Sequence, residues 1–134
     1  MIYHRIEQAI QLAVLKELPD ADVTRILVRP CDPKFGDYQS NALMALAKHR
    51  KMNPRELAVA VKAHLDVGEW CEKVEIAGAG FLNFHLKKCV IEAELRSAAE
   101  GEHLFFAEPK EPRTIVIDFS SPNVAKPMHV GHIR

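Results

Sequence analysis

The stretch KVEIAGAGFLNFHL, residues 73–86, decides the fold of this chain. Val74 and Ile76 alternate with charged residues in its first half, and Phe81 to Leu86 alternate in the same way. Alternation with a period of two is typical of a strand with one buried face. The Ala-Gly-Ala-Gly between the halves suits a tight turn or a bulge. The stretch therefore predicts an antiparallel hairpin.

The second strand of this hairpin has two different faces. Phe81 and Asn83 share one face and Leu82 and Phe84 share the other, because successive side chains of a strand alternate. Leu82 with Phe84 is the more apolar pair, so we expect that pair to face the core and Phe81 to be exposed. An aromatic residue in a strand usually packs in the core, but an exposed one beside an amide is a candidate stacking site.

Helical periodicity surrounds the hairpin, and one further strand is expected before it. Helices are predicted at 2–18, 41–50, 53–67 and 87–101. Ser40 or Asn41 could cap the second helix, and Asn53-Pro54 with an acid in the first turn is a strong start for the third. The β-branched run VTRILV, residues 23–28, predicts a strand, and residues 31–41 predict a loop. The fold class is α+β, an antiparallel sheet with covering helices.

A second domain is predicted after a linker. AEPKEPRT, residues 107–114, combines two prolines with four charges, which is typical of a linker. The run Thr114–Phe119 that follows has unbroken apolar residues, as in parallel strands buried on both faces. We expect one domain over 1–110 and, over 111–134, the first strand and loop of a Rossmann-like α/β domain that is truncated.

Composition limits the classes of protein. Lys plus Arg equals Asp plus Glu at 18 each, so net charge does not indicate a nucleic-acid partner. The three cysteines form no Cys-x-x-Cys pair, and we expect reduced thiols and no metal site. No apolar run approaches the roughly 20 residues that span a bilayer, and the N-terminus does not resemble a signal peptide. We expect a cytoplasmic protein without membrane contact.

The segment that follows the predicted parallel strand concentrates polar chemistry. Asp118 lies near the end of that strand, where open α/β sheets bind ligands. His129 and His132 are three residues apart, on one side of a new helix's first turn, with Gly131 between them. The start of a helix favours phosphate. From the residues alone, the histidines could equally be surface residues or half of a metal site, and Asp118 could cap the loop.

The terminal sequence resembles a known family. His129-Val130-Gly131-His132 is similar to the His-Ile-Gly-His signature of class I aminoacyl-tRNA synthetases, and FSSPNVAKPMHVGH, residues 119–132, resembles the arginyl-tRNA synthetases in particular. KFGDYQSNALMALAK and IAGAGFLNFHL resemble stretches of the N-terminal additional domain of that family. The resemblance covers the chain from about residue 34 onward.

The resemblance implies roles for particular residues. Asp118, Ser121, Asn123 and His129 would bind arginine. Lys126, His129, Gly131 and His132 would bind ATP, and His129 and His132 would act in catalysis. Phe81 and Asn83 would bind tRNA, the ring stacking on a D-loop base and the amide contacting its edge.

The resemblance also implies the reaction and the partners. The full-length enzyme would activate arginine with ATP, with Mg²⁺ expected, and transfer it to tRNA(Arg), and would be a monomer. The chain would be its N-terminal fragment, with the rest of the catalytic sheet and the anticodon-binding domain missing. We expect the fragment alone to bind no cofactor and to be inactive. Two other hypotheses stay open: a free-standing RNA-binding module and a module that binds other proteins.

Overall fold

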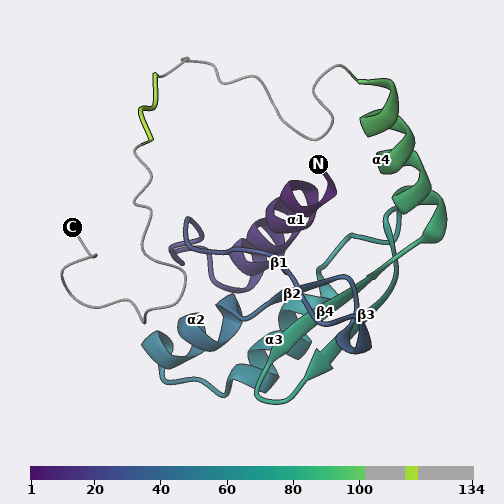
Figure 1. Ribbon diagram of the computed structural model, residues 1–134. Coiled ribbons are helices and arrows are strands. Elements are labelled where there is room, and N and C mark those ends of the chain that lie inside the picture. The colour runs from purple at the N-terminus through teal and green to yellow at the C-terminus, as the bar shows by residue number, and fades with distance from the viewer. Residues whose placement is uncertain (102–113, 118–134) are drawn as a thin grey trace, which may run out of the picture.

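The computed structural model describes residues 1–101 and 114–117 (Figure 1). The helices are α1 (Ile2–Glu17), the 3-10 helix η1 (Pro33–Phe35), α2 (Ala42–Arg50), α3 (Pro54–Ala63) and α4 (Lys88–Glu100). The strands are β1 (Arg29–Pro30), β2 (Tyr38–Ser40), β3 (Cys71–Ala77) and β4 (Phe81–Leu86). The four strands form one antiparallel sheet in the order β1-β2-β4-β3. The α+β class with an antiparallel sheet is confirmed.

The predicted hairpin is β3 and β4. Ala77 pairs with Phe81 next to the turn, and the pairing continues to Cys71 and Leu86 at the other end. Gly78 and Gly80 have φ angles of 51° and 115°, values that residues with a side chain rarely adopt. The glycines between the two alternating runs therefore have the turn role that the sequence predicts.

The inner face of the sheet and three helices form the core. Leu82 and Phe84 are both fully buried, as the alternation predicts. The largest fully buried side chains come from α1, the segment before β1, α2, α3 and β4: Ile6, Ile10, Val14, Ile26, Leu43, Leu57, Val61, Leu82 and Phe84. The helix α4 extends from the end of β4 (Figure 1) and has one buried residue, Ala98.

The predicted start of the third helix is confirmed and its end is corrected. Asn53 caps α3, because its Oδ1 accepts from the backbone N–H of Arg55 at 3.0 Å, and Pro54 opens the helix. The helix ends at Ala63, before the predicted stop at Gly68. Asn41 precedes α2 without a side-chain cap. The hydroxyl of Ser40 accepts from the backbone N–H of Ala42, the first residue of α2, at 3.5 Å. It also donates to the carbonyl of Leu27 at 2.8 Å, which joins β2 to the segment before β1.

The strand predicted at Val23–Val28 is wrong. The side chain of Asp22 accepts from the backbone N–H of Thr24 at 3.0 Å, which makes a turn where the strand was expected. The N–H of Val28 donates to Oε1 of Glu7 on α1, at 2.9 Å, so it is not available to a neighbouring strand. The β-branched run is still buried in part, at Ile26 and Val28. Two side chains of the run pack in the core, while its backbone forms a turn and an irregular segment.

Two further differences concern short segments. The predicted loop 31–41 contains β2, which pairs with β4. Of the predicted parallel strand, the structure describes residues 114–117, which form neither helix nor strand and are exposed. A parallel strand needs a neighbour in the sheet, and none pairs with them within the described ranges. No helix among the described residues has the length and hydrophobicity to cross a membrane.

Candidate nucleic-acid interface

The face of the sheet opposite Leu82 and Phe84 carries a polar row across all four strands. Arg29 on β1 pairs with Gln39 on β2, Gln39 pairs with Asn83 on β4, and Asn83 pairs with Glu75 on β3. Side chains of directly paired residues lie on the same face of an antiparallel sheet. We call this surface, with Phe81 and the other outward residues of β3 and β4, the outer face.

Phe81 lies at the turn end of the outer face and is half-buried. Its cross-strand partner is Ala77, and a Cβ added at Gly78 would lie 3.7 Å from the Phe81 ring. Because one of these neighbours has a methyl side chain and the other has none, neither can cover the ring. The sequence predicts an exposed ring, and the structure corrects this: the ring is half-buried and keeps only part of its surface in solvent.

Asn83 lies on the same face as Phe81, as the alternation predicts, but it is buried. The residue is only 2% exposed, and its Oδ1 accepts a hydrogen bond from Nε2 of Gln39 at 2.7 Å. Asn83 is therefore closed to solvent although it shares a face with Phe81. The reason is the neighbouring strand β2, which the sequence pattern did not reveal and which brings Gln39 against Asn83.

Beside Asn83, three charged or polar side chains form a bonded cluster. Oε1 of Glu75 lies 2.5 Å from Nζ of Lys73, and Oε2 lies 3.0 Å from Nε2 of His85. The hydrogen bond from Lys73, followed by that from His85, lowers the pKa of the Glu75 carboxyl below its usual value. Glu75 is therefore held as a carboxylate with both oxygens occupied. His85, which the sequence left without a role, is part of this cluster.

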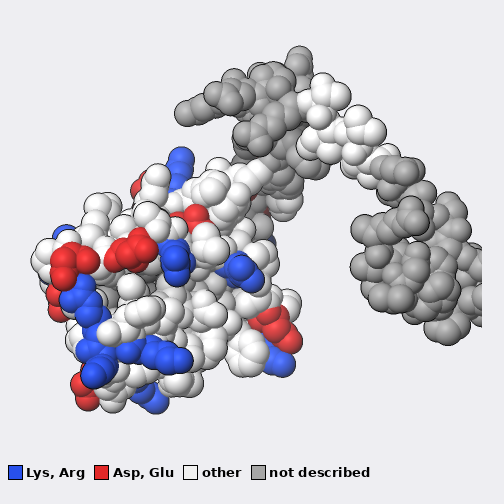
Figure 2. Space-filling model, turned by 90° about the vertical axis from the view of Figure 1, so that its left-hand side faces the viewer, with Lys and Arg blue, Asp and Glu red and all other residues white. Residues whose placement is uncertain are grey.

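A cationic segment, residues 48–55, lies next to the turn between β3 and β4. It holds Lys48, Arg50, Lys51 and Arg55, all exposed, and no acid. The contact is close, because a Cβ added at Gly80 would lie 2.8 Å from the carbonyl oxygen of Pro54. Lysine and arginine side chains gather low on the surface in Figure 2, which faces the side of the molecule that carries α2 in Figure 1. The local patch that a neutral chain needs for RNA is thus present.

One ion pair occupies part of this segment. Nη2 of Arg50 lies 2.8 Å from Oδ1 of Asp20. Among the described residues, Lys48, Lys51 and Arg55 have no acidic side chain within ion-pair distance. Their charges are therefore available to phosphate groups.

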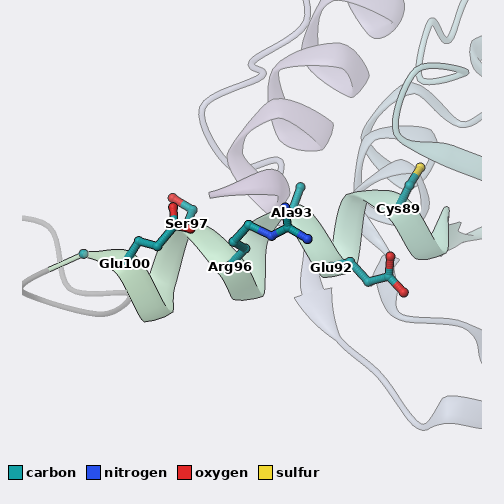
Figure 3. Close-up of a pocket in the computed structure, with 7 residues that line it drawn as sticks. Cys89, Glu92, Ala93, Arg96, Ser97 and Glu100 are labelled. Atoms are coloured by element: carbon teal, nitrogen blue, oxygen red, sulfur yellow. The ribbon is translucent and has the colours of Figure 1, made fainter.

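Other hollows of the surface carry less chemistry. A hollow along α4 is lined by residues of that helix and by Gly101, and Figure 3 shows Cys89, Glu92 and Arg96 spread along this one helix. A second hollow lies between α1 and Trp70, whose ring is 5.8 Å from the guanidinium carbon of Arg5. Within the described residues, no three His, Cys, Asp or Glu side chains form a group that could hold a metal ion.

The predicted ligands of arginine and ATP all lie outside the described residues. These are Asp118, Ser121, Asn123, Lys126, His129, Gly131 and His132. The same holds for the predicted domain boundary at 110 and 111. Gln39, by contrast, lies in the described part and was missed. Local sequence gives no signal for it, because its partner Asn83 is 44 residues away.

Two family models match the chain. The first is described as "Arginyl tRNA synthetase N terminal domain" and matches residues 1–86. The second is described as "tRNA synthetases class I (R), catalytic domain" and matches residues 94–134. The outer face of the sheet lies within the first match.

Curated relatives are similar over nearly the whole chain. The arginine–tRNA ligase of Thermosynechococcus vestitus is 49% identical over 131 residues, which is 97% of this chain and 22% of the relative. That of Pseudoalteromonas translucida is 45% identical over 129 residues, which is 96% of this chain and 22% of the relative. The chain thus spans about a fifth of the length of these relatives.

Solved structures agree with the sequence comparisons. The arginyl-tRNA synthetase of Thermus thermophilus has a TM-score of 0.62 and 34% identity, with 84% of this chain and 17% of that one covered. The arginyl-tRNA synthetase of Plasmodium falciparum, at 23% identity and a TM-score of 0.63, shares the fold over 75% of this chain and 19% of its own. A family model over 86 residues and these relatives together lead to one conclusion: this chain belongs to the arginyl-tRNA synthetase family.

Proposed function

We propose that this chain forms the N-terminal part of an arginine–tRNA ligase and that residues 1–110 bind tRNA(Arg) at its D-loop. The observation that carries this proposal is the outer face, where a half-buried aromatic ring lies beside a buried carboxamide and next to a cationic segment. RNA is recognised mainly through unpaired bases that stack on aromatic rings and hydrogen-bond along their edges. All three elements of such recognition are within the part of the chain that matches the family's N-terminal domain.

Phe81 and Asn83 would contact one unpaired base. The ring of Phe81 would stack on the face of the base, and the carboxamide of Asn83 would hydrogen-bond to its edge. The small neighbours Ala77 and Gly78 support this role, because they leave part of the half-buried ring accessible at the end of the hairpin. Loops and bulges of tRNA present such bases, and a D-loop is one of them.

Lys48, Lys51 and Arg55 would contact the phosphates on either side of that base. Their charges are exposed and unpaired among the described residues, and Pro54 joins their segment to the hairpin turn. Phosphate contacts fix the register of a nucleic acid without reading its sequence. In this proposal the cationic segment binds the phosphates, and Phe81 with Asn83 recognises the base.

Residues 111–134 would begin the catalytic domain. Asp118, Ser121, Asn123 and His129 would hold arginine, and Lys126, His129, Gly131 and His132 would hold ATP, with Mg²⁺ as its counter-ion. The two histidines would donate to phosphate oxygens as charge develops during adenylate formation. The protein would act in the cytoplasm, and the full-length enzyme would be a monomer. Since the chain covers only 22% of the length of its relative from Thermosynechococcus vestitus, we expect the 134 residues alone to form no arginyl-adenylate.

Binding to tRNA with an altered D-loop tests the proposal. The full chain is titrated with a tRNA(Arg) transcript and with transcripts that carry an abasic site at each unpaired D-loop position in turn. One abasic site is expected to weaken binding by about tenfold, the loss of one stacked base. Equal affinity for all transcripts would contradict D-loop recognition. Arginine-dependent exchange of pyrophosphate into ATP by the chain, with tRNA present, would contradict its expected inactivity.

A further inference from the structure

We propose that Gln39 is a positioning residue that fixes which end of the Asn83 carboxamide faces the bound base, and that Gln39 thereby sets the base preference of the site. The inference rests on the proposed function, since it requires that Asn83 contacts a base. Gln39 itself would act through Asn83. Gln39 lies on β2 and Asn83 on β4, which do not follow each other in the chain. In the sheet the two residues are direct cross-strand partners.

The hydrogen bond between the two amides carries the proposal. A carboxamide has an acceptor end, the oxygen, and a donor end, the NH₂ group. Nε2 of Gln39 donates to Oδ1 of Asn83 at 2.7 Å, so Gln39 engages the acceptor end. Asn83 is 2% exposed, and water therefore competes little for this bond. The orientation of the Asn83 amide is held by its neighbour on β2.

The donor end of Asn83 remains available. Its other cross-strand neighbour is Glu75, whose two carboxylate oxygens already bond to Lys73 and His85. Among the described residues, no acceptor takes a hydrogen bond from Nδ2 of Asn83. Within the described residues, Nε1 of Trp70 is the only side-chain nitrogen or oxygen that is both fully buried and without a hydrogen-bond partner, so Nδ2 of Asn83 does not combine these two conditions. On this proposal, the small exposed area of Asn83 includes its donor.

This arrangement gives the site a polarity. An outward NH₂ group favours a base that presents a carbonyl oxygen or a ring nitrogen acceptor at that point, and disfavours one that presents a donor. A buried donor without a partner is costly, so a mismatch at this position penalises the wrong base. A reversed amide would present the oxygen and would reverse the preference. Base choice thus depends on Gln39, a residue that need not touch the base.

Replacing Gln39 by glutamate is the sharpest test. A carboxylate only accepts hydrogen bonds, so Gln39→Glu requires Asn83 to turn its NH₂ group toward β2 and its oxygen toward the base. Arg29 is the other cross-strand neighbour of Gln39, so we expect it to stabilise the introduced charge. Gln39→Met is the matched control, since it keeps the length of the side chain and removes the hydrogen bond.

The experiment measures four affinities for each protein. The full chain and its two variants are titrated with four tRNA(Arg) transcripts that carry A, C, G or U at the D-loop position whose abasic form binds wild type most weakly. Gln39→Glu is expected to change the order of the four bases, with ratios of dissociation constants shifting by about tenfold. Gln39→Met is expected to bring the four dissociation constants closer together. A general charge effect or a loss of stability would change all four dissociation constants by the same factor. Thermal unfolding of each variant measures the loss of stability.

The possible results separate the two claims. If Gln39→Glu and Gln39→Met keep the wild-type order and ratios while Phe81→Ala weakens binding, the positioning role of Gln39 is overturned and the proposed RNA site stands. If Phe81→Ala and the abasic transcripts leave binding unchanged, the proposed function itself fails. A changed order of bases in Gln39→Glu supports both.

Discussion

Gly80, in the turn of the hairpin, lies directly against Pro54, the first residue of α3. A Cβ added at Gly80 would lie 2.8 Å from the carbonyl oxygen of Pro54 and 3.0 Å from its carbonyl carbon. The contact joins the strand that carries Phe81 to the segment that carries Lys51 and Arg55. Proximity between the Phe81 ring and the cationic segment thus depends on a position that has no side chain.

Gly80→Ala is expected to destabilise the fold. The φ angle of 115° is unfavourable for alanine, and the new methyl group meets backbone atoms that cannot move aside. We expect the free energy of unfolding to fall by about 1–3 kcal/mol, measured by chemical denaturation. Gly68→Ala is the control, because a Cβ there meets no atom within 4 Å. Equal effects of the two substitutions would contradict the importance of the Pro54 contact.

Glu7 is expected to hold the segment before β1 in place. Its Oε1 accepts from the N–H of Val28 at 2.9 Å, and its side chain is 13% exposed. Glu7→Ala leaves that N–H without a partner and should cost about 1–3 kcal/mol of unfolding free energy. Glu7→Gln keeps an acceptor and should cost less. His4→Ala removes only the exposed partner of Oε2 and should change stability little, so a large effect there would argue against this assignment.

Elements held together by interactions between nearby residues were predictable from the sequence, and those that depend on distant residues were not. The hairpin was predictable because its two strands and its glycines adjoin in the chain. The strand at Val23–Val28 was a wrong prediction because two side chains, Asp22 within the turn and Glu7 on α1, take the backbone into a different path. A β-branched run cannot reveal a partner 21 residues away.

The same limit applies to the site. The shared face of Phe81 and Asn83 follows from strand alternation alone. The burial of Asn83 does not, because it depends on Gln39 in a stretch of Gly, Pro and Asp residues that resembles a loop. Pairing of β2 with β4 is a tertiary event, and it determines both the missed strand and the missed residue.

The cysteines should differ in reactivity toward a disulfide reagent. Burial raises the pKa of the Cys71 thiol to about 11, so at pH 8 only about one molecule in a thousand carries the reactive thiolate. Burial, with the carboxylates of Asp37 and Asp32, also raises the pKa of Cys31. Cys89 is exposed and should react first. Cys89→Ser should remove the fast phase in native protein, and a fast phase that remained would contradict the order.

Glu75 should contribute to stability only above acidic pH. The bonds from Lys73 and His85 lower its pKa in the folded state below the usual 4.5. A lowered folded pKa stabilises the fold fully above the unfolded value, and the contribution is lost as pH falls through the folded value. Glu75→Gln should therefore be less stable than wild type above about pH 5, with the difference shrinking as pH falls.

Urea denaturation between about pH 3 and pH 7 measures this dependence. Glu72→Gln, a change at an exposed acid on the same strand, is the control. A constant difference between Glu75→Gln and wild type at every pH would show that the side chain acts by packing and not by its charge.

The affinity of the full chain for tRNA(Arg) after Phe81→Leu is the decisive measurement for the outer face as an RNA-binding surface. Leucine keeps an apolar side chain in the same place and removes the flat ring that would stack on a base, whereas Phe81→Tyr keeps the ring. We expect Phe81→Leu to weaken binding by about 1–3 kcal/mol, Phe81→Tyr to bind nearly as wild type does, and both variants to remain folded. Unchanged affinity in a folded Phe81→Leu chain would contradict the assignment of the outer face as the RNA-binding surface.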